Sequence, residues 1–260
     1  MKPSLLKNKT IQIFCLWALT AIAINAGDLN ERYSIEYGIL GEVANVSASL
    51  KSDKKHYILD ANVTITGSIA KMITRHLKER HISKGHIKDG RLISDSYQMI
   101  KSYGKYKSTT LYETHHKRKK VTKAFKLWKN GKKVVDEFRT LGYYGANDMM
   151  TLFLNLNKQI KKKNLPKHYR YKVVGADRMN GLVDVIVPSK KELKKILPLL
   201  GEEKNSWYSK VIMHRKLYNS KQGELAVKIG KEAILDKAVL KDLIFFGDVR
   251  IIRERADPHR

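Results

Sequence analysis

Histidine binds transition metals and titrates near neutral pH, and three of the nine histidines of this sequence, His76, His81 and His86, recur every five residues. Imidazole nitrogens bind transition metals when several ligands converge and neighbouring groups hold them in place. Residues at this odd spacing alternate between the two faces of an extended strand, so only His76 and His86 would share a face. No cysteine and no tight carboxylate cluster accompanies them. We therefore predict no metal site and no cofactor.

A second pair of histidines, His115-His116, stands immediately before the basic run Lys117–Lys120. We interpret this stretch as a solvated strand edge, where lysines discourage pairing with another strand. The functional alternative is that the run contacts anions, with Arg118 and Lys119 as the candidate residues.

Two further groups of lysines adjoin apolar segments. Lys161, Lys162 and Lys163 follow a very apolar stretch, where they complement the dipole of a helix C-terminus or form a basic lip beside an apolar cavity. Lys190, Lys191, Lys194 and Lys195 lie opposite a stripe formed by Leu193, Ile196, Leu197 and Leu200. This pattern is typical of a basic amphipathic helix, for which we favour ordinary packing over peripheral membrane contact.

The sequence holds no recognisable catalytic motif. It has no G-x-S-x-G elbow, no phosphate-binding loop ending in Gly-Lys-Ser/Thr, and no H-E-x-x-H pair of metal ligands. We therefore predict that the protein is not an enzyme. A catalytic site assembled from distant parts of the chain is the alternative, because such sites leave no local signature.

The first 26 residues predict export. A basic start is followed by the apolar run Ile11–Ile24 and by Ala26 as a cleavage position, which is the pattern of a secretory signal peptide. An uncleaved membrane anchor is the alternative. Cleavage would remove three lysines and Cys15, the only cysteine, lowering the net charge from +27 to +24. We expect a single β-rich domain over residues 27–260 in the periplasm of a Gram-negative envelope.

The remaining chain predicts a sheet. Apolar residues alternate with polar ones over Tyr33–Ile39, Tyr57–Ile65 and Leu225–Ile229, which is the period of half-buried strands. Asp89-Gly90 and Asn130-Gly131 are typical of tight hairpin turns. The fold class is therefore mainly β, a strongly curved antiparallel sheet or half-open β-barrel with two or three short helices packed on or inside it.

Two helices are expected to pack on the sheet before residue 161. Residues 67–76 place Ile69, Met72, Ile73 and His76 on one helical face, with Ser68 as a cap, and should lie over one end of the sheet. Residues 147–160, capped by Asn147, are apolar nearly all round and should be buried within the curve of the sheet. The residues expected to line a ligand cavity there are Met149, Met150, Phe153, Leu156 and Phe245.

The chain resembles the exported bacterial proteins grouped as domain of unknown function 3108. The resemblance is carried by Tyr33–Gly41, by Asp148–Leu152 and by the closing strands Lys241–Arg253. It implies a periplasmic β-rich domain, and its motifs are structural, not catalytic. By looser analogy with periplasmic lipoprotein carriers, the curved sheet would enclose acyl chains.

We expect a non-catalytic envelope protein that binds lipid or another acylated anionic envelope molecule, with buried chains shielded from water and lysines paired with phosphates. The alternative is a scaffold that binds an acidic polymer or a partner protein through its basic surface. Export argues against nucleic acid as the partner, although such a positive charge would suggest it in the cytoplasm.

Overall fold

A computed structural model of the chain describes residues 29–176, 179–214, 224–243 and 247–255. The predicted signal peptide and Phe245 lie outside the described residues. Within them, the strands form one sheet of 15 strands, antiparallel except for the pairing of β9 with β10. The predicted class, mainly β with a strongly curved antiparallel sheet and two or three short helices, is confirmed, and the described residues form three α-helices.

The sheet has two arms that meet where β1 pairs with β15. One arm runs outward in chain order: β1 (Leu29–Tyr37), β2 (Glu42–Ser52), β3 (His56–Ile65), β4 (Lys78–Lys88), β5 (Arg91–Tyr103), β6 (Tyr106–His115), β7 (Lys120–Lys129) and β8 (Lys132–Thr140). The other returns inward: β9 (Asn147–Asp148), β10 (Lys167–Val174), β11 (Leu182–Val187), β12 (Trp207–Ile212), β13 (Glu224–Ile229), β14 (Leu235–Leu243) and β15 (Gly247–Arg253). The chain thus crosses once, from β8 to β9.

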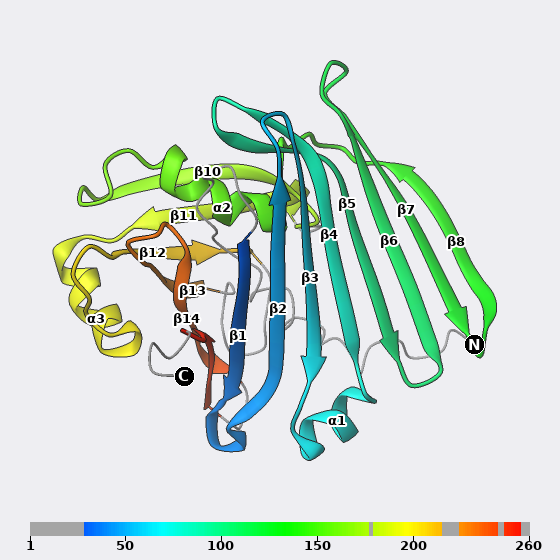
Figure 1. Cartoon of the computed structure of the whole chain (residues 1–260), viewed down its shortest axis with the longest axis horizontal. Coiled ribbons are helices and arrows are strands. Elements are labelled where there is room, and N and C mark those ends of the chain that lie inside the picture. The colour runs from blue at the N-terminus through cyan, green and yellow to red at the C-terminus, as the bar shows by residue number, and fades with distance from the viewer. Residues whose placement is uncertain (1–28, 177–178, 215–223, 244–246, 256–260) are drawn as a thin grey trace.

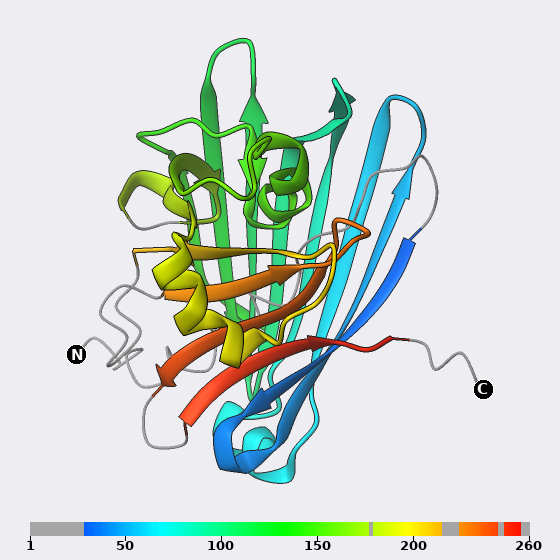
Figure 2. The ribbon, with the colours of Figure 1, turned by 90° about the vertical axis from the view of Figure 1, so that its left-hand side faces the viewer.

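The two arms run in different directions because the sheet bends strongly. Figure 1 shows β2 to β8 side by side, and Figure 2 shows β12 to β15 crossing that arm at a steep angle. Helix α2 (Met149–Gln159) lies between the arms, and its first eight residues are buried. It contacts β5 from one arm and β9 and β10 from the other. The predicted burial of this segment inside the curve is confirmed.

Hairpin turns form where the sequence predicts them. Asp89 and Gly90 have φ of 51° and 68°, and Asn130 and Gly131 have 50° and 77°. These left-handed conformations suit Asn, Asp and Gly and match the twist of the flanking strands. The β4–β5 and β7–β8 hairpins are therefore set by local sequence.

Residues 141–148 close the sheet against β5. The backbone N–H of Ser94 donates to the carbonyl oxygen of Ala146, at 2.9 Å, and β9 follows directly. Pairing of β5 with β6 begins only at Ser96. Strands β6 to β8 therefore extend beyond the point of closure, and we call residues 106–140 the wing.

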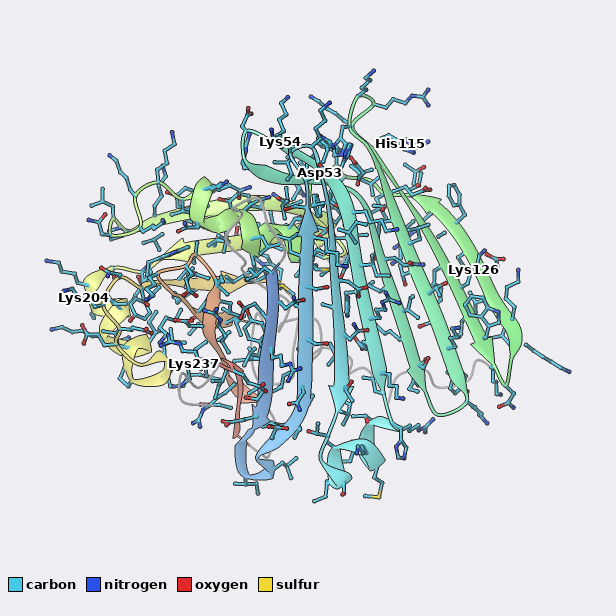
Figure 3. All side chains as sticks on the ribbon, viewed as in Figure 1. Asp53, Lys54, His115, Lys126, Lys204 and Lys237 are labelled. Carbon is cyan, nitrogen blue, oxygen red and sulfur yellow. The ribbon has the colours of Figure 1, made fainter. Side chains whose placement is uncertain are left out.

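The wing is basic and ends on an exposed strand. It contains eleven lysines and arginines against three acidic residues, a net charge of +8. Eight of the nine residues of β8 are exposed. Figure 3 places Lys126 on the wing and Lys204 and Lys237 on the opposite side, so positive charge is not confined to it.

Helix α1 (Ser68–Thr74) faces the sheet with a different side from the predicted one. Ala70 packs against the core and Thr74 is buried, whereas the larger Ile69, Met72 and Ile73 are exposed. The N-cap is Gly67, which makes no side-chain cap bond. Small residues let the helix approach the strands closely, and this turns the larger side chains outward.

Helix α3 (Lys190–Leu200) packs as predicted. The capping box forms, with Ser189 N–H donating to Glu192 Oε2 at 3.0 Å and Glu192 N–H donating to Ser189 Oγ at 3.3 Å. Ile196 and Leu200 pack with Ala226 and Val239 on β13 and β14. Pro198 is of a residue type that usually ends or kinks a helix, but it lies inside α3, which continues to Leu200 before its C-cap Gly201.

None of the helices that the structure describes is both long enough and apolar enough to span a membrane.

A bulge between β4 and β5 yields the first prediction. Gly85 pairs with Ser94 where the register shifts, and a Cβ at this position would collide with the carbonyl oxygen of Ile93 and lie 2.9 Å from the backbone nitrogen of Asp95. Because these contacts are backbone atoms, Gly85→Ala should lower the free energy of unfolding by about 1–3 kcal/mol in urea titrations. Gly142→Ala is the control, since nothing lies within 4 Å of a Cβ there. Equal stability of the two variants would contradict the prediction.

Candidate functional site

Large apolar side chains gather in the open at one end of the molecule. Ile39 belongs to the short helix η2 (Gly38–Leu40) between β1 and β2, and is 85% exposed. On α1, Ile69, Met72 and Ile73 are 54%, 71% and 46% exposed. Figure 1 shows α1 and the β1–β2 connection at the same, lower end. We call these four residues the apolar end.

Backbone contacts join the connections that make up this end. The N–H of Thr66, which leads into α1, donates to the carbonyl of Val43 at 3.0 Å, next to η2. At the other end of α1, Gly104 N–H in the β5–β6 turn donates to the carbonyl of Arg75 at 2.8 Å. The exposed aliphatic side chains are therefore carried on anchored backbone.

Basic residues adjoin the apolar end. Lys71 and Arg75 on α1 and Lys105 in the β5–β6 turn are exposed. Arg75 and His76 both have φ of 57°, a left-handed conformation that ends the helix abruptly. Such backbone is costly for residues other than glycine and is often found at functional sites.

The residues predicted to line a ligand cavity lie in the core. Met149, Met150, Phe153 and Leu156 are all at most 2% exposed and belong to one hydrophobic cluster with both arms of the sheet. The signal for their burial was the all-round apolarity of the helix. Their role as ligand contacts stays a prediction.

The predicted anion contacts lie on two separate connections. Arg118 and Lys119 are exposed in the β6–β7 turn of the wing. Lys161 and Lys162 are exposed after α2, whereas the Lys163 ammonium lies 5.9 Å from the ring centre of Trp207. Partial burial lowers the pKa of Lys163.

A buried carboxylate holds the start of α2 against the sheet. Asp148 is the N-cap of α2, where Asn147 was expected, and its Oδ1 accepts from the N–H groups of Met150 and Thr151, both at 2.8 Å. Its Oδ2 accepts from the hydroxyls of Ser83 on β4, at 2.5 Å, and Ser94 on β5, at 2.7 Å. Burial raises the pKa of Asp148, although all four donors favour the ionised form.

Asn147 takes a bridging role instead of the capping role. Its side-chain oxygen accepts from Asn155 Nδ2 at 2.7 Å, and Asn155 also bonds both backbone groups of Leu92. Through Asn155, this contact ties the middle of α2 to β5, while the neighbouring Asp148 carboxylate caps the helix.

His81 belongs to a second buried polar chain. Its Nε2 lies 3.1 Å from Glu79 Oε2 and its Nδ1 lies 2.9 Å from Tyr97 Oη. Burial lowers the pKa of His81, because it disfavours the charged form of the ring. Burial opposes ionisation of Glu79, but Lys101 and His81 hold the pKa of Glu79 below its usual value. Because His81 and Glu79 are fully buried, a substrate cannot reach this row of polar side chains.

The other two regularly spaced histidines do not join His81. His76 is exposed at the end of α1. His86 and His116 instead converge on Asp95: His86 Nδ1 lies 3.0 Å from Asp95 Oδ1, and His116 Nε2 lies 2.9 Å from the same oxygen. Of the stretch expected to be a solvated edge, His115 and Lys117–Lys120 are exposed, whereas His116 is half-buried. Periodicity missed the cluster because its members come from three separate segments.

A polar groove of about 1180 Å³ opens beside β1 and the end of β15. Arg253 pairs there with Glu31 and Glu232, both at 2.6 Å. Arg255 pairs with Glu203 at 2.8 Å. These charges already have partners, and the residues that line the groove are polar or charged apart from Ala48, which does not suit an acyl chain.

The fold and these buried polar contacts define a β-barrel-like protein with an open wing. Among solved structures the chain is similar to a β-barrel-like protein of domain of unknown function DUF1849 from Brucella abortus. The two chains are 9% identical, with a TM-score of 0.50 over 90% of this chain and 98% of that one. The likeness concerns the fold alone.

No protein-family model matches the chain, and no curated protein does. The resemblance to domain of unknown function 3108 is thus supported only at the coarser level of a β-barrel-like domain of unknown function.

The pKa of Asp148 gives the second prediction. Because it is higher in the folded than in the unfolded protein, Asp148 favours folding fully below the unfolded pKa of about 3.9, and this contribution is lost as pH rises through the folded pKa. Asp148→Asn cannot titrate. The free energy of unfolding of this variant, relative to that of the native protein, should therefore be constant below a pH of about 4. Above about pH 4 it should increase as the native Asp148 ionises.

Urea unfolding at a series of pH values measures this difference. Asp136→Asn on β8 is the control, because the Lys133 ammonium lowers the pKa of that exposed carboxyl. If the stability of Asp148→Asn relative to the native protein instead falls as pH rises, burial does not dominate the pKa of Asp148.

Proposed function

We propose that this chain is an exported, non-catalytic envelope protein that docks on an anionic lipid surface by its apolar end. The observation that carries the proposal is the exposure of Ile39, Ile69, Met72 and Ile73 at one end of the molecule, beside exposed basic residues. Clustered apolar side chains rimmed by polar ones are typical of protein or membrane contact sites.

Charge supports a membrane as the partner. Lys71, Arg75 and Lys105 border the apolar end, and each lysine or arginine near an anionic lipid surface contributes about 1 kcal/mol. Insertion of aliphatic groups adds about 0.8 kcal/mol per buried CH₂. Neither contribution anchors a protein alone, but the two together give stable and reversible docking.

The position of α2 favours docking by the surface over storage of acyl chains. The helix occupies the space between the two arms, and its buried residues pack with the strands in one cluster. An acyl chain in this space would have to displace α2 from the Asp148 contacts.

The position of α3 favours α1 as the lipid contact. The apolar stripe of α3 packs on β13 and β14, whereas the large apolar residues of α1 have no such cover among the described residues. The predicted signal peptide supports an envelope location, where anionic phospholipids and lipopolysaccharide are available.

The third prediction concerns α1. The triple variant Ile69→Ser, Met72→Ser, Ile73→Ser should bind vesicles of equal parts phosphatidylglycerol and phosphatidylcholine at least about tenfold more weakly than the native protein, a loss of about 1.4 kcal/mol or more. Vesicle co-sedimentation measures the binding. The matched control is Ile58→Ser, Val134→Ser, Phe138→Ser, which removes three comparably exposed side chains elsewhere and should leave binding unchanged.

Several results would overturn this function. They are native protein that does not bind the anionic vesicles, native protein that binds pure phosphatidylcholine equally well, and a control triple that loses as much as the α1 triple. Salt-sensitive binding to a soluble polyanion without vesicle binding would support the scaffold alternative. Affinity that grows with acyl-chain length for a single dispersed lipid would support storage in the interior.

A further inference from the structure

The structure brings four chain segments together where β5 parts from β6. The residues of β5 that precede Ser96 do not pair with β6. The gap is bordered by His86 on β4, Asp95 on β5, His116 in the β6–β7 turn, and Tyr144 in the segment that leads to β9. In Figure 3 the neighbouring His115 marks this end of the wing.

A β-bulge directs Asp95 into this gap. Lys84 on β4 pairs with Ser96 on β5, and Gly85 pairs with Ser94. Asp95 is therefore the extra residue of the bulge, with no partner on β4. Bulges redirect side chains and are frequent beside functional sites. Here Ser94 points inward to Asp148, while Asp95 meets the two imidazoles.

We propose that His86, Asp95 and His116 form a binding site for a divalent transition-metal ion, with zinc as the expected occupant. Two imidazoles and one carboxylate are borderline ligands suited to such ions. They leave a fourth position for water or an exogenous anion.

The geometry fits an ion with small side-chain adjustments. Zinc bonds of about 2.0–2.1 Å place tetrahedral ligand atoms about 3.3 Å apart. In the protein, the two imidazole nitrogens lie 3.0 and 2.9 Å from Asp95 Oδ1, and the three candidate ligand atoms all lie within 4.8 Å of one another. The side chains of His86, Asp95 and His116 are 38%, 46% and 23% exposed, so an ion can reach them from solvent.

Tyr144 supplies the outer support that a bound histidine needs. Its hydroxyl lies 2.8 Å from His116 Nδ1, and its ring meets the imidazole edge-on with centroids 5.9 Å apart. Because His116 Nε2 faces Asp95, the Nδ1 proton can be donated to the Tyr144 oxygen, which fixes the tautomer with Nε2 free to bind metal.

A second histidine–carboxylate cluster shows what distinguishes the site. Asp184 lies 3.0 Å from His168 and 2.8 Å from His214, but Arg170 also donates to it at 2.9 Å. The guanidinium already neutralises that carboxylate. Among the residues that the structure describes, Asp95 forms no ion pair with a lysine or arginine. The basic turn beyond His116 is exposed and therefore screened by water and salt.

The fourth prediction is zinc binding by the full chain after removal of metal with a chelator. Isothermal titration with zinc chloride at pH 7.5 should give one equivalent per chain. His116→Ala and Asp95→Asn should each weaken binding at least about tenfold, and Tyr144→Phe about tenfold, as outer-shell substitutions do. His115→Ala removes the exposed neighbouring imidazole and should leave the affinity unchanged.

Two further measurements protect the test from misfolding. Circular dichroism without metal identifies variants that do not fold, and Tyr144→Phe, the smallest of these changes, provides the test if His116→Ala fails. Cobalt in place of zinc should give the intense visible absorption of a four-coordinate ion, and Asp95→Asn should abolish it. Native protein that takes up no zinc, or folded Asp95→Asn and His116→Ala that bind as tightly as His115→Ala, would overturn the site. The cluster would then only join the wing to the barrel.

Discussion

The outermost strands of the two arms, β8 and β9, do not pair with each other, and the carboxylate of Asp148 supplies much of the connection that a closed ladder would otherwise give. It accepts hydrogen bonds from β4, β5 and the first turn of α2 at once. A buried carboxylate is tolerated only when donors satisfy it, and this arrangement brings four. The position of α2 between the arms follows from this contact together with the buried apolar face of the helix.

The bulge at Gly85 and Asp95 separates two environments on consecutive residues. Ser94 completes the interior contacts of Asp148, and the backbone N–H of Ser94 meets the segment before β9. Asp95 faces the histidines of the wing junction. One irregularity of register thus serves both the closure of the barrel and the attachment of the wing, because an extra residue reverses the direction of the side chains that follow.

Local patterns predicted much of the fold. Alternation identified the strands, and Asp89-Gly90 and Asn130-Gly131 identified hairpins, because each pattern depends on residues close in sequence. The predictions that failed concern residues whose partners are distant in sequence. Asp148, not Asn147, caps α2 because only its carboxylate also meets hydroxyls on two strands.

The candidate sites were harder to predict for the same reason. The large residues of α1 turn outward because the smaller Ala70 and Thr74 face the strands, which an apolar stripe alone does not reveal. The contact of His86 with His116 requires both the bulge and the departure of β6. Spacing within one segment could place only His76 and His86 on a common face, and it could not reveal that His86 meets Asp95 and His116.

The pairing of β1 with β15 has a consequence for how the chain reaches this structure. Ile35 lies opposite Ile251, so the seam between the arms joins the first and last strands described. Contacts of such long sequence separation form slowly, because a large loop must close before they contribute. Until β15 arrives, β1 and β14 each present an unpaired edge to solvent. A chain that emerges in N-to-C order during synthesis would therefore need protection of β1, by a chaperone or by transient pairing, until β15 has emerged.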